Sequence, residues 1–542
     1  MRKPGVACQQ CRIGKRKCDR PQGVSCQPCL RRNIQCSSGR IARLQVALQP
    51  VSARSPGSAQ GHQDAGRGPQ EPPSPRNALD SLTPDQIQQL VGYYIEYLHD
   101  KSHSLFHVPT LRSIVTDGSI DRPLLCAIVA LSARFSSDQA VSSLGAVLAD
   151  YATSLMQSDL ETLSIDSVRA FILLGYIRGA DFKSASESLF FGIATRIAYI
   201  IRLAEPCDNE SAVQTETRAR IWWSLYMVDR WSSAGLGTPR QMSDRQPSQR
   251  LPRREHIFHS LSPKCPTWPL EEDAPGLWAH MITLVEIFGP IQDLNRLIAL
   301  GSVDASFIAP TVSNLAKRLD DWQLALPKDD RLSASTLATH QARGQGRAFV
   351  ALHMGYFHYA TLLYFQYLDQ GAAALPWAGI YAERCREHAS AFSDLLRTSN
   401  DKKDCAAMYD IVGHMTVVSS SVLIHTLLLG DEQQVEPAKA RLESNFQALL
   451  RLKVWWPSVD KVTQRLFKFQ RACLRSVDNR THKIDRWTVK FLLEHGNVLD
   501  DKFEEITVDT PSPYGFSPDS PMAQRILERD RITRDAMSGL RT

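Results

Sequence analysis

Six cysteines gather near the start of the chain at a spacing that suits a metal cluster. They are Cys8, Cys11, Cys18, Cys26, Cys29 and Cys36, and they form two CxxCx6C halves separated by seven residues. In each half, two close thiolates can bind one cation from a tight turn, and a third arrives after a short helix. Zinc suits thiolates and takes four ligands in a tetrahedron. Six thiolates complete two tetrahedra when two sulfurs are shared, so the sequence predicts a cluster of two Zn²⁺ ions.

Two other readings of these cysteines fit less well. A disulfide scaffold is the first alternative, but the chain begins Met1-Arg2-Lys3-Pro4 and has no apolar stretch like that of a secretory signal. We therefore expect an intracellular protein, in a compartment where thiols stay reduced. Two independent zinc sites are the second alternative, and they would need more ligands than six cysteines supply.

The cysteine segment also carries most of the positive charge. The first 45 residues hold eleven Arg and Lys against Asp19 alone, so they carry +10 and leave −4 for the rest of a chain whose net charge is +6. A basic head on a mildly acidic body is typical of an element that binds phosphates. The sequence therefore predicts double-stranded DNA as a partner. A solvated charged face is the alternative reading.

The head resembles the fungal Zn₂Cys₆ transcription factors. The resemblance implies that Cys8 and Cys26, the first cysteine of each half, are ligands that bridge both zinc ions. The remaining ligands that it implies are Cys11 and Cys18 for one zinc and Cys29 and Cys36 for the other.

The residues between Cys11 and Cys18 are similar to the family's Cys-Arg-x-x-Lys-x-Lys-Cys pattern. The resemblance implies that this short helix enters the major groove and that Lys15 contacts guanine edges in a CGG triplet, where O6 and N7 accept hydrogen bonds. Gly14 departs from many members, which have a basic or polar side chain there. The residues expected to hold phosphates and set the register are Arg12, Arg16, Lys17, Arg31 and Arg32.

The elements behind the head divide into a linker and a helical body. Residues 46–83 are rich in Ser, Gly, Pro and Gln and hold few large apolar side chains, so we expect a flexible linker. At Thr83-Pro84 a capping residue and a helix-starting proline precede apolar residues at helical spacing. Helical periodicity continues to about residue 497 without convincing strand alternation. The predicted fold is all-α: a small Zn₂Cys₆ head from 1–45, the linker, and a large multi-helix regulatory domain.

The periodicity places helices approximately. The ranges expected after the first helix are 121–136, 139–158, 164–178, 184–203, 214–233, 274–299, 308–325, 340–370, 377–397, 403–430, 436–452, 459–477 and 481–496.

A second resemblance covers residues 84–330, which are similar to the fungal-specific regulatory domain often called the middle homology region. Its clearest piece runs from Arg218 to Arg230, an R-x-R-x-W-W-x-L-x-x-x-D segment before a G-x-P turn. Asp229 shares a helix face with apolar residues, and we expect it to pair with Arg218 in the core. Contact with an effector is the alternative. Residues 331–497 are expected to continue the same helical domain.

Three further expectations concern possible partners. His103 and His107 stand four residues apart as metal ligands do, but no patterned third ligand follows, so we expect a surface pair. Residues 498–542 mix acidic, bulky apolar and Pro residues, which indicates a largely disordered tail that contacts the transcription machinery. An ordinary solvated terminus is the alternative. Apolar runs such as Val417–Leu429 are too short or too interrupted for the roughly 20 residues of a membrane span, so we expect no membrane partner.

Together, the residues and the two resemblances predict a nuclear, sequence-specific regulator of transcription by RNA polymerase II that reads CGG-like triplets and has no enzymatic activity. We expect it to control a metabolic or secondary-metabolite pathway. A helical enzyme fused to a metal-binding head is one alternative, although Asp320-Asp321 alone supplies no terpene-synthase metal motif. A head that binds proteins instead of DNA is another.

The valency of DNA binding depends on the residues that come directly after the head. Ile41, Leu44 and Leu48 give barely one heptad before Pro50, and stable coiled coils need several. If two chains form a homodimer, we therefore expect the pairing to come from the helical body.

Overall fold

The helical body begins where the sequence places its first capping signal. In the computed structural model, Thr83 caps helix α5 (Pro84–Tyr97): its hydroxyl accepts from the backbone N–H of Gln86, and the Gln86 side chain accepts from the N–H of Thr83. This reciprocal capping box satisfies two of the backbone donors that a helix start leaves open. The structure describes residues 77–207, 209–243, 250–269, 274–368, 377–479, 485–501 and 521–537.

Helices account for most of the described residues. In the first half they are α4 (Asn77–Asp80), α5, α6 (Val108–Thr116), α7 (Arg122–Ser132), α8 (Gln139–Ser158), α9 (Ile165–Ala180), α10 (Ser184–Ile200), α11 (Ala212–Leu236), α12 (Glu255–Ser260) and α13 (Leu277–Ala299). In the second half they are α14 (Ala305–Ala325), α15 (Ala334–Ala342), α16 (Gly346–Tyr364), α17 (Ala378–Asp401), α18 (Ile411–Leu429), α19 (Glu432–Lys453), α20 (Ser458–Asn479), α21 (Arg486–Leu492) and α22 (Pro521–Met537).

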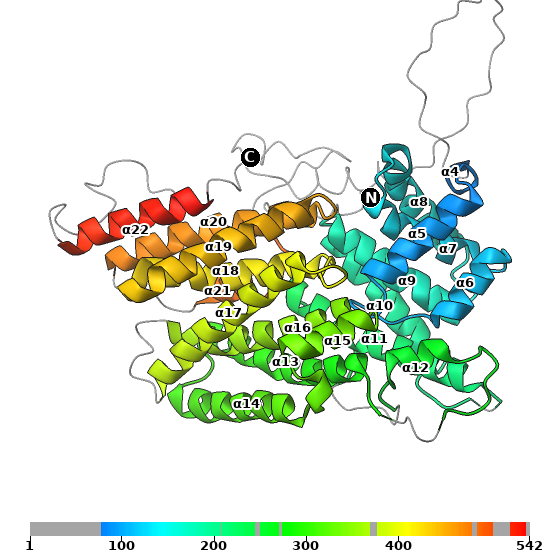
Figure 1. Ribbon diagram of the computed structural model, residues 1–542, viewed down its shortest axis with the longest axis horizontal. Helices are drawn as coiled ribbons and strands as arrows, with labels where there is room; N and C mark the ends of the chain where they lie inside the picture. The colour runs from blue at the N-terminus through cyan, green and yellow to red at the C-terminus, as the bar shows by residue number, and fades with distance from the viewer. Residues whose placement is uncertain are drawn as a thin grey trace, which may run out of the picture. The chain divides into compact units, whose positions relative to one another are not determined.

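Helices that follow one another in the chain mostly pack side by side. Helix α7 packs on α8 and α9, α9 on α10, α10 on α11, α16 on α17, and α17 on α18. Figure 1 shows this as a gradual change of colour, from the blue and cyan helices α5–α9 through the green α11–α16 to the yellow and orange α17–α20. The described residues contain no β-strand, and the predicted all-α class is confirmed.

Two helices run through the core. Helix α11 is buried along most of its length, and Trp223 and Met227 keep at most 2% of their surface exposed. Helix α18 is apolar enough to meet a length and hydropathy criterion for a membrane span, the one helix among the described residues that does so. However, 94% of its most apolar window is buried among other helices of the body. A helix that is apolar on all sides fits the centre of a large protein equally well.

The end of α11 joins the two halves of the body. Gly237 ends the helix in the left-handed region with φ 68°, which glycine adopts without a side-chain clash. Beside it, the N–H of Gly496 donates to the carbonyl of Gly235 at 2.9 Å. A Cβ on Gly235 would lie 2.5 Å from the His495 ring, so only glycine allows this approach. Residues 495–497 therefore pack directly against the end of α11.

Several helices differ from the sequence-based expectation. The predicted range 139–158 coincides with α8, whereas α6, α12 and α15 were not expected, because short helices contain too few turns to show a period. Helix α22 lies within the tail expected to be largely disordered. It packs against α18 and α19, where Thr533 and Met537 are buried and Arg529 pairs with Glu432 at 2.9 Å. The segment 502–520 lies outside the described residues.

Candidate functional site

The predicted zinc ligands and DNA contacts lie outside the described residues. These residues are Cys8, Cys11, Cys18, Cys26, Cys29 and Cys36, together with Arg12, Lys15, Arg16, Lys17, Arg31 and Arg32. Their fit to a metal therefore rests on donor chemistry. Six thiols offer the soft ligands that zinc prefers, in a number that serves two ions through two shared sulfurs.

Within the helical body, the polar centre of α11 is Arg220. Its Nε donates to Glu216 Oε1 at 3.0 Å, its Nη1 donates to Ser104 Oγ at 3.1 Å, and its Nη2 donates to the carbonyl oxygen of Arg253 at 2.5 Å. The guanidinium also lies over the Phe258 ring, 4.5 Å from the centroid. The arginine is fully buried, so its charge depends on these partners.

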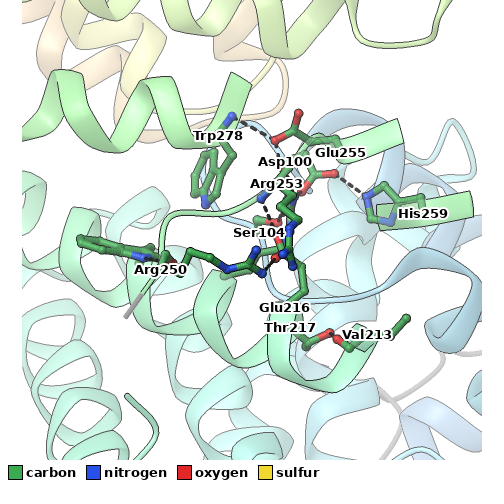
Figure 2. Close-up of polar contacts among 12 residues, drawn as sticks. Asp100, Ser104, Val213, Glu216, Thr217, Arg250, Arg253, Glu255, His259 and Trp278 are labelled. Atoms are coloured by element: carbon green, nitrogen blue, oxygen red, sulfur yellow. Dashed lines mark hydrogen bonds and ion pairs between the residues drawn. The ribbon is translucent and has the colours of Figure 1, made fainter. Parts of the chain in front are cut away.

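Three acidic side chains from separate segments lie within 4.0 Å of Arg220. Figure 2 labels them as Asp100, Glu216 and Glu255. Glu216 also accepts from the N–H of Arg253 at 2.8 Å and from the Arg250 guanidinium at 3.3 Å. Glu255 lies 3.7 Å from Arg220 and caps α13 by accepting from the N–H groups of Leu277 and Trp278. The cluster therefore fixes the loop before α12 and the start of α13 to the middle of α11.

Asp100 belongs to the same cluster and has two histidine neighbours. His99, Asp100 and His259 offer three ligand atoms within 4.8 Å of one another, as a metal site would. However, His99 Nε2 accepts from the N–H groups of Leu105 and Phe106, and His259 Nδ1 accepts from the N–H of Val108. The ring nitrogens that face Asp100 therefore carry hydrogens and are donors rather than metal ligands.

The charge state of Asp100 agrees with this arrangement. Burial alone would favour the neutral acid, but His99 and His259 hold the pKa of Asp100 well below its ordinary value. Burial lowers the pKa of His99, which keeps that ring neutral. The three side chains form a carboxylate held by histidine N–H groups, which is a structural contact.

The prediction that His103 and His107 form a pair on the surface is wrong. His103 and His107 are buried, with 0% and 2% of their surface exposed. His103 Nε2 lies 2.8 Å from the Tyr94 hydroxyl, and His107 Nδ1 lies 2.7 Å from Thr110 Oγ1. The two rings therefore face different partners.

The predicted partner of Asp229 is also wrong. Asp229 lies 3.2 Å from Arg230 and accepts from the N–H groups of Gln241 and Met242 at 2.8 and 3.0 Å. Arg218 instead pairs with Glu210 at 3.5 Å. Eleven residues of helix separate Arg218 from Asp229, about 16 Å along the axis, which no single ion pair can span. Asp229 therefore anchors the turn that follows α11.

The Arg220 cluster was missed by sequence reasoning, although one signal was present. Glu216 and Arg220 stand at i and i+4 in the helix, the spacing at which acidic and basic side chains meet. The cluster holds segments together and brings no nucleophile or general base to an open cleft. Its chemistry is that of structural support.

Comparison with known proteins adds to this geometry. Residues 6–44 match the fungal Zn(2)-Cys(6) binuclear cluster domain, which includes all six predicted cysteine ligands. Residues 91–338 match the fungal specific transcription factor domain, which includes α11 and the Arg220 cluster. Both resemblances inferred from the sequence are thereby confirmed.

The curated relatives are named as transcription factors or transcriptional regulatory proteins. The Zn(2)-C6 fungal-type transcription factor FTF1c of Fusarium oxysporum f. sp. lycopersici is 20% identical over 465 residues, which cover 77% of this chain and 49% of the relative. FTF2 from the same fungus is 21% identical over 77% of this chain and 42% of its own length. An uncharacterised transcriptional regulatory protein of Schizosaccharomyces pombe is 22% identical over 65% of this chain and 59% of the relative. The chain thus spans about half the length of the Fusarium relatives.

Proposed function

Because the chain belongs to the fungal transcription factors that join a Zn(2)-Cys(6) binuclear cluster domain to a fungal specific transcription factor domain, we propose that it is a nuclear regulator of RNA polymerase II transcription. It reads CGG-like triplets in double-stranded DNA and has no catalytic activity. The observation that carries the proposal is the head, where two CxxCx6C halves enclose a basic run within residues 6–44.

Zinc binding follows from the family, and we propose two Zn²⁺ ions per chain. Cys8 and Cys26 bridge the ions, each of which takes two further thiolates from its own half: Cys11 and Cys18 on one side, Cys29 and Cys36 on the other. So short a segment has almost no hydrophobic core. When bound, zinc would therefore hold its fold together through the metal–thiolate bonds. The thiolates hold the ions, and the basic side chains between them face the nucleic acid.

Within the head, we propose separate roles for reading and holding DNA. Lys15 donates to guanine acceptors in the major groove and so distinguishes a CGG triplet from other sequences. Arg12, Arg16, Lys17, Arg31 and Arg32 neutralise phosphates, which adds affinity without sequence preference.

The remaining parts have supporting roles in this proposal. Residues 46–76 act as a flexible tether. The expected linker ended at residue 83, but residues 77–83 already belong to the folded body, where Ala78, Leu79 and Leu82 are buried. Residues 84–330 with 331–497 form the regulatory domain. If a homodimer forms, it pairs through this helical body. The tail, 498–542, contacts the transcription machinery, and the target genes belong to a metabolic or secondary-metabolite pathway.

The proposed function is tested by binding of the full chain to two duplexes that differ in one CGG triplet. We expect tighter binding to the CGG duplex, and a steep loss of affinity for both duplexes as salt rises, because phosphate contacts release counterions. Chelation of zinc should abolish binding to both duplexes. Equal binding to the two duplexes would reject sequence-specific reading, and no binding to either would favour a head that binds proteins.

A further inference from the structure

The interior of the helical body contains a cavity that the Arg220 cluster does not use. Its walls come from residues far apart in the chain, among them Tyr176 of α9, Glu187 of α10, Trp231 of α11, His358 of α16 and His414 of α18. The cavity volume is about 100 Å³, measured as the space open to the centres of water molecules. One water needs roughly 10–15 Å³ of such space, so the cavity has room for a ligand on the order of ten non-hydrogen atoms.

Two carboxyl groups line this cavity. The Glu187 carboxyl accepts from Ser232 Oγ at 3.2 Å, and Asp410 lies at the start of α18. Among the described residues, neither has a basic side chain within 4.0 Å. Both side chains remain partly accessible although they lie inside the body. An acid in such a place, without a cation, is normally costly.

Burial raises the pKa values of both acids. Burial and the neighbouring Asp410 raise the pKa of Glu187 to about 8, against the small opposing effect of the Ser232 hydroxyl. Burial raises the pKa of Asp410 to about 6, although the Ile411 N–H and Arg134 oppose the rise. A bound cation would reverse both shifts, because it favours the charged carboxylates.

Lys101 is the one Lys or Arg among the lining residues, and it already has a partner. Its Nζ donates to the carbonyl oxygen of Ile95 at 2.9 Å. The cavity histidines are neutral, since burial lowers the pKa of His358 to about 3 and that of His495 to about 4. The polar groups of the cavity are therefore mostly hydrogen-bond acceptors and carboxyl groups. They suit a cationic ligand better than an anionic one.

The rest of the wall is apolar and aromatic. Phe288 and Tyr359 stack with ring centroids 4.5 Å apart, and Trp231 Nε1 donates to the Tyr359 hydroxyl at 2.7 Å. Aromatic faces attract cations as well as apolar groups. From the cavity, its two unpaired acids and these rings, we propose that the helical body binds a small ligand that has an apolar body and a protonated amino group.

The cavity also suggests how such a ligand would act on the chain. Its walls join the matched regulatory domain, through α11 and α13, to the later helices α16 and α18 and to His495. An amine held by Glu187 and Asp410 would therefore fasten the two halves of the body together. That this changes DNA binding rests on the proposed function, whereas the binding itself does not.

The test measures the thermal transition of the full chain with three probes of one shape: 2-phenylethylamine, 2-phenylethanol and phenylacetate. The amine should raise the transition temperature, and the neutral and acidic probes should raise it much less. Glu187→Gln keeps the shape of the side chain and prevents it from becoming a carboxylate when the amine binds. It should weaken amine binding about 10- to 100-fold, the range for a charged hydrogen bond. Glu161→Gln, at an exposed acid, is the matched control and should bind the amine as the native chain does.

A second variant tests whether the amine binds in this cavity and leaves Glu187 and Asp410 unchanged. Ala351→Leu adds volume to the cavity wall and should reduce amine binding while the unliganded chain stays folded. The proposal is overturned if the amine gives no shift, if the three probes shift the transition equally, or if Glu187→Gln binds the amine as well as the control does. Duplex binding with and without the amine tests regulation separately. Loss of DNA binding with a retained amine shift would reject the proposed function alone.

Discussion

Glu216 and Arg220 form an ion pair one turn apart on α11, with 3.0 Å between Oε1 and Nε and both side chains fully buried. The pair is the centre of a cluster in which Arg253 donates its N–H to Glu216 and accepts from Arg220 through its carbonyl oxygen. Residue 253 also forms an isolated backbone bridge with Pro275, so the cluster and this bridge together tie the loop to α11 and to the start of α13. The Arg218–Arg230 segment, the clearest motif of the body, therefore stabilises the fold.

The first prediction concerns this pair. Arg220→Met should lower the free energy of unfolding by about 3–5 kcal/mol, because it leaves Glu216 with a buried, poorly compensated charge. Urea unfolding of the full chain, followed by helical circular dichroism, measures the loss.

The matched control is Arg202→Met, at an exposed pair with Glu205. Exposed pairs contribute about 0–1 kcal/mol, so this variant should unfold nearly as the native chain does. If the two variants lose the same stability, Arg220 is not the support that its contacts indicate.

The second prediction separates the observed partners of Asp229 from the expected one. In a double-mutant cycle of Arg218→Ala and Asp229→Ala, the coupling energy should lie within about 0.5 kcal/mol of zero, since the residues share no partner. Asp229→Ala alone should destabilise the chain, because the N–H groups of Gln241 and Met242 lose their acceptor. A coupling energy well above about 1 kcal/mol would restore the Arg218–Asp229 pair.

The sequence was most informative where local chemistry decides the structure. Thr83 and Pro84 mark the start of α5 because a capping hydroxyl and a proline act within one turn. Helix α8 was located by its long apolar period. Helix α22 was not, because its sequence is strongly charged and its order depends on contacts such as Arg529 with Glu432, 97 residues away.

The contacts within the body were less accessible from the sequence. Arg218 and Asp229 share a helix face, but a shared face does not make a contact when three turns intervene. The real partners of Asp229 lie beyond the helix, in a turn whose path no periodicity predicts. The cavity is a stronger case, because Glu187 and Asp410 meet only after more than two hundred residues of chain have folded between them.

The third prediction uses the raised pKa of Glu187. The folded chain holds a proton on Glu187 up to about pH 8, while the unfolded chain releases it near 4.5, so this residue's contribution to stability falls as pH rises between those values. Relative to the native chain, Glu187→Gln should therefore gain stability from about pH 5 to 8 and level off above. Thermal unfolding at stepped pH measures the difference. Glu161→Gln should show none, and a flat difference for Glu187→Gln would contradict the raised pKa.

The fourth prediction concerns metal. The full chain should contain two zinc ions, and Cys26→Ser should lose both, because a bridging thiolate serves both tetrahedra. The helical body has its own extensive core, so its thermal transition should persist in this variant. Metal analysis with calorimetry tests both statements. One zinc in the native chain, or an unchanged zinc content in Cys26→Ser, would reject the shared-ligand cluster.

Sequence reading by the head is tested by the affinity of the full chain for a CGG duplex and for a scrambled duplex at fixed salt. The proteins compared are the native chain, Lys15→Ala and Arg32→Ala. Lys15→Ala should lose about 1–3 kcal/mol on the CGG duplex and little on the scrambled one. Arg32→Ala should weaken both duplexes alike, because a phosphate contact carries no sequence information. If Lys15→Ala lowers affinity for both duplexes equally, or the native chain does not distinguish them, the head does not read sequence as proposed.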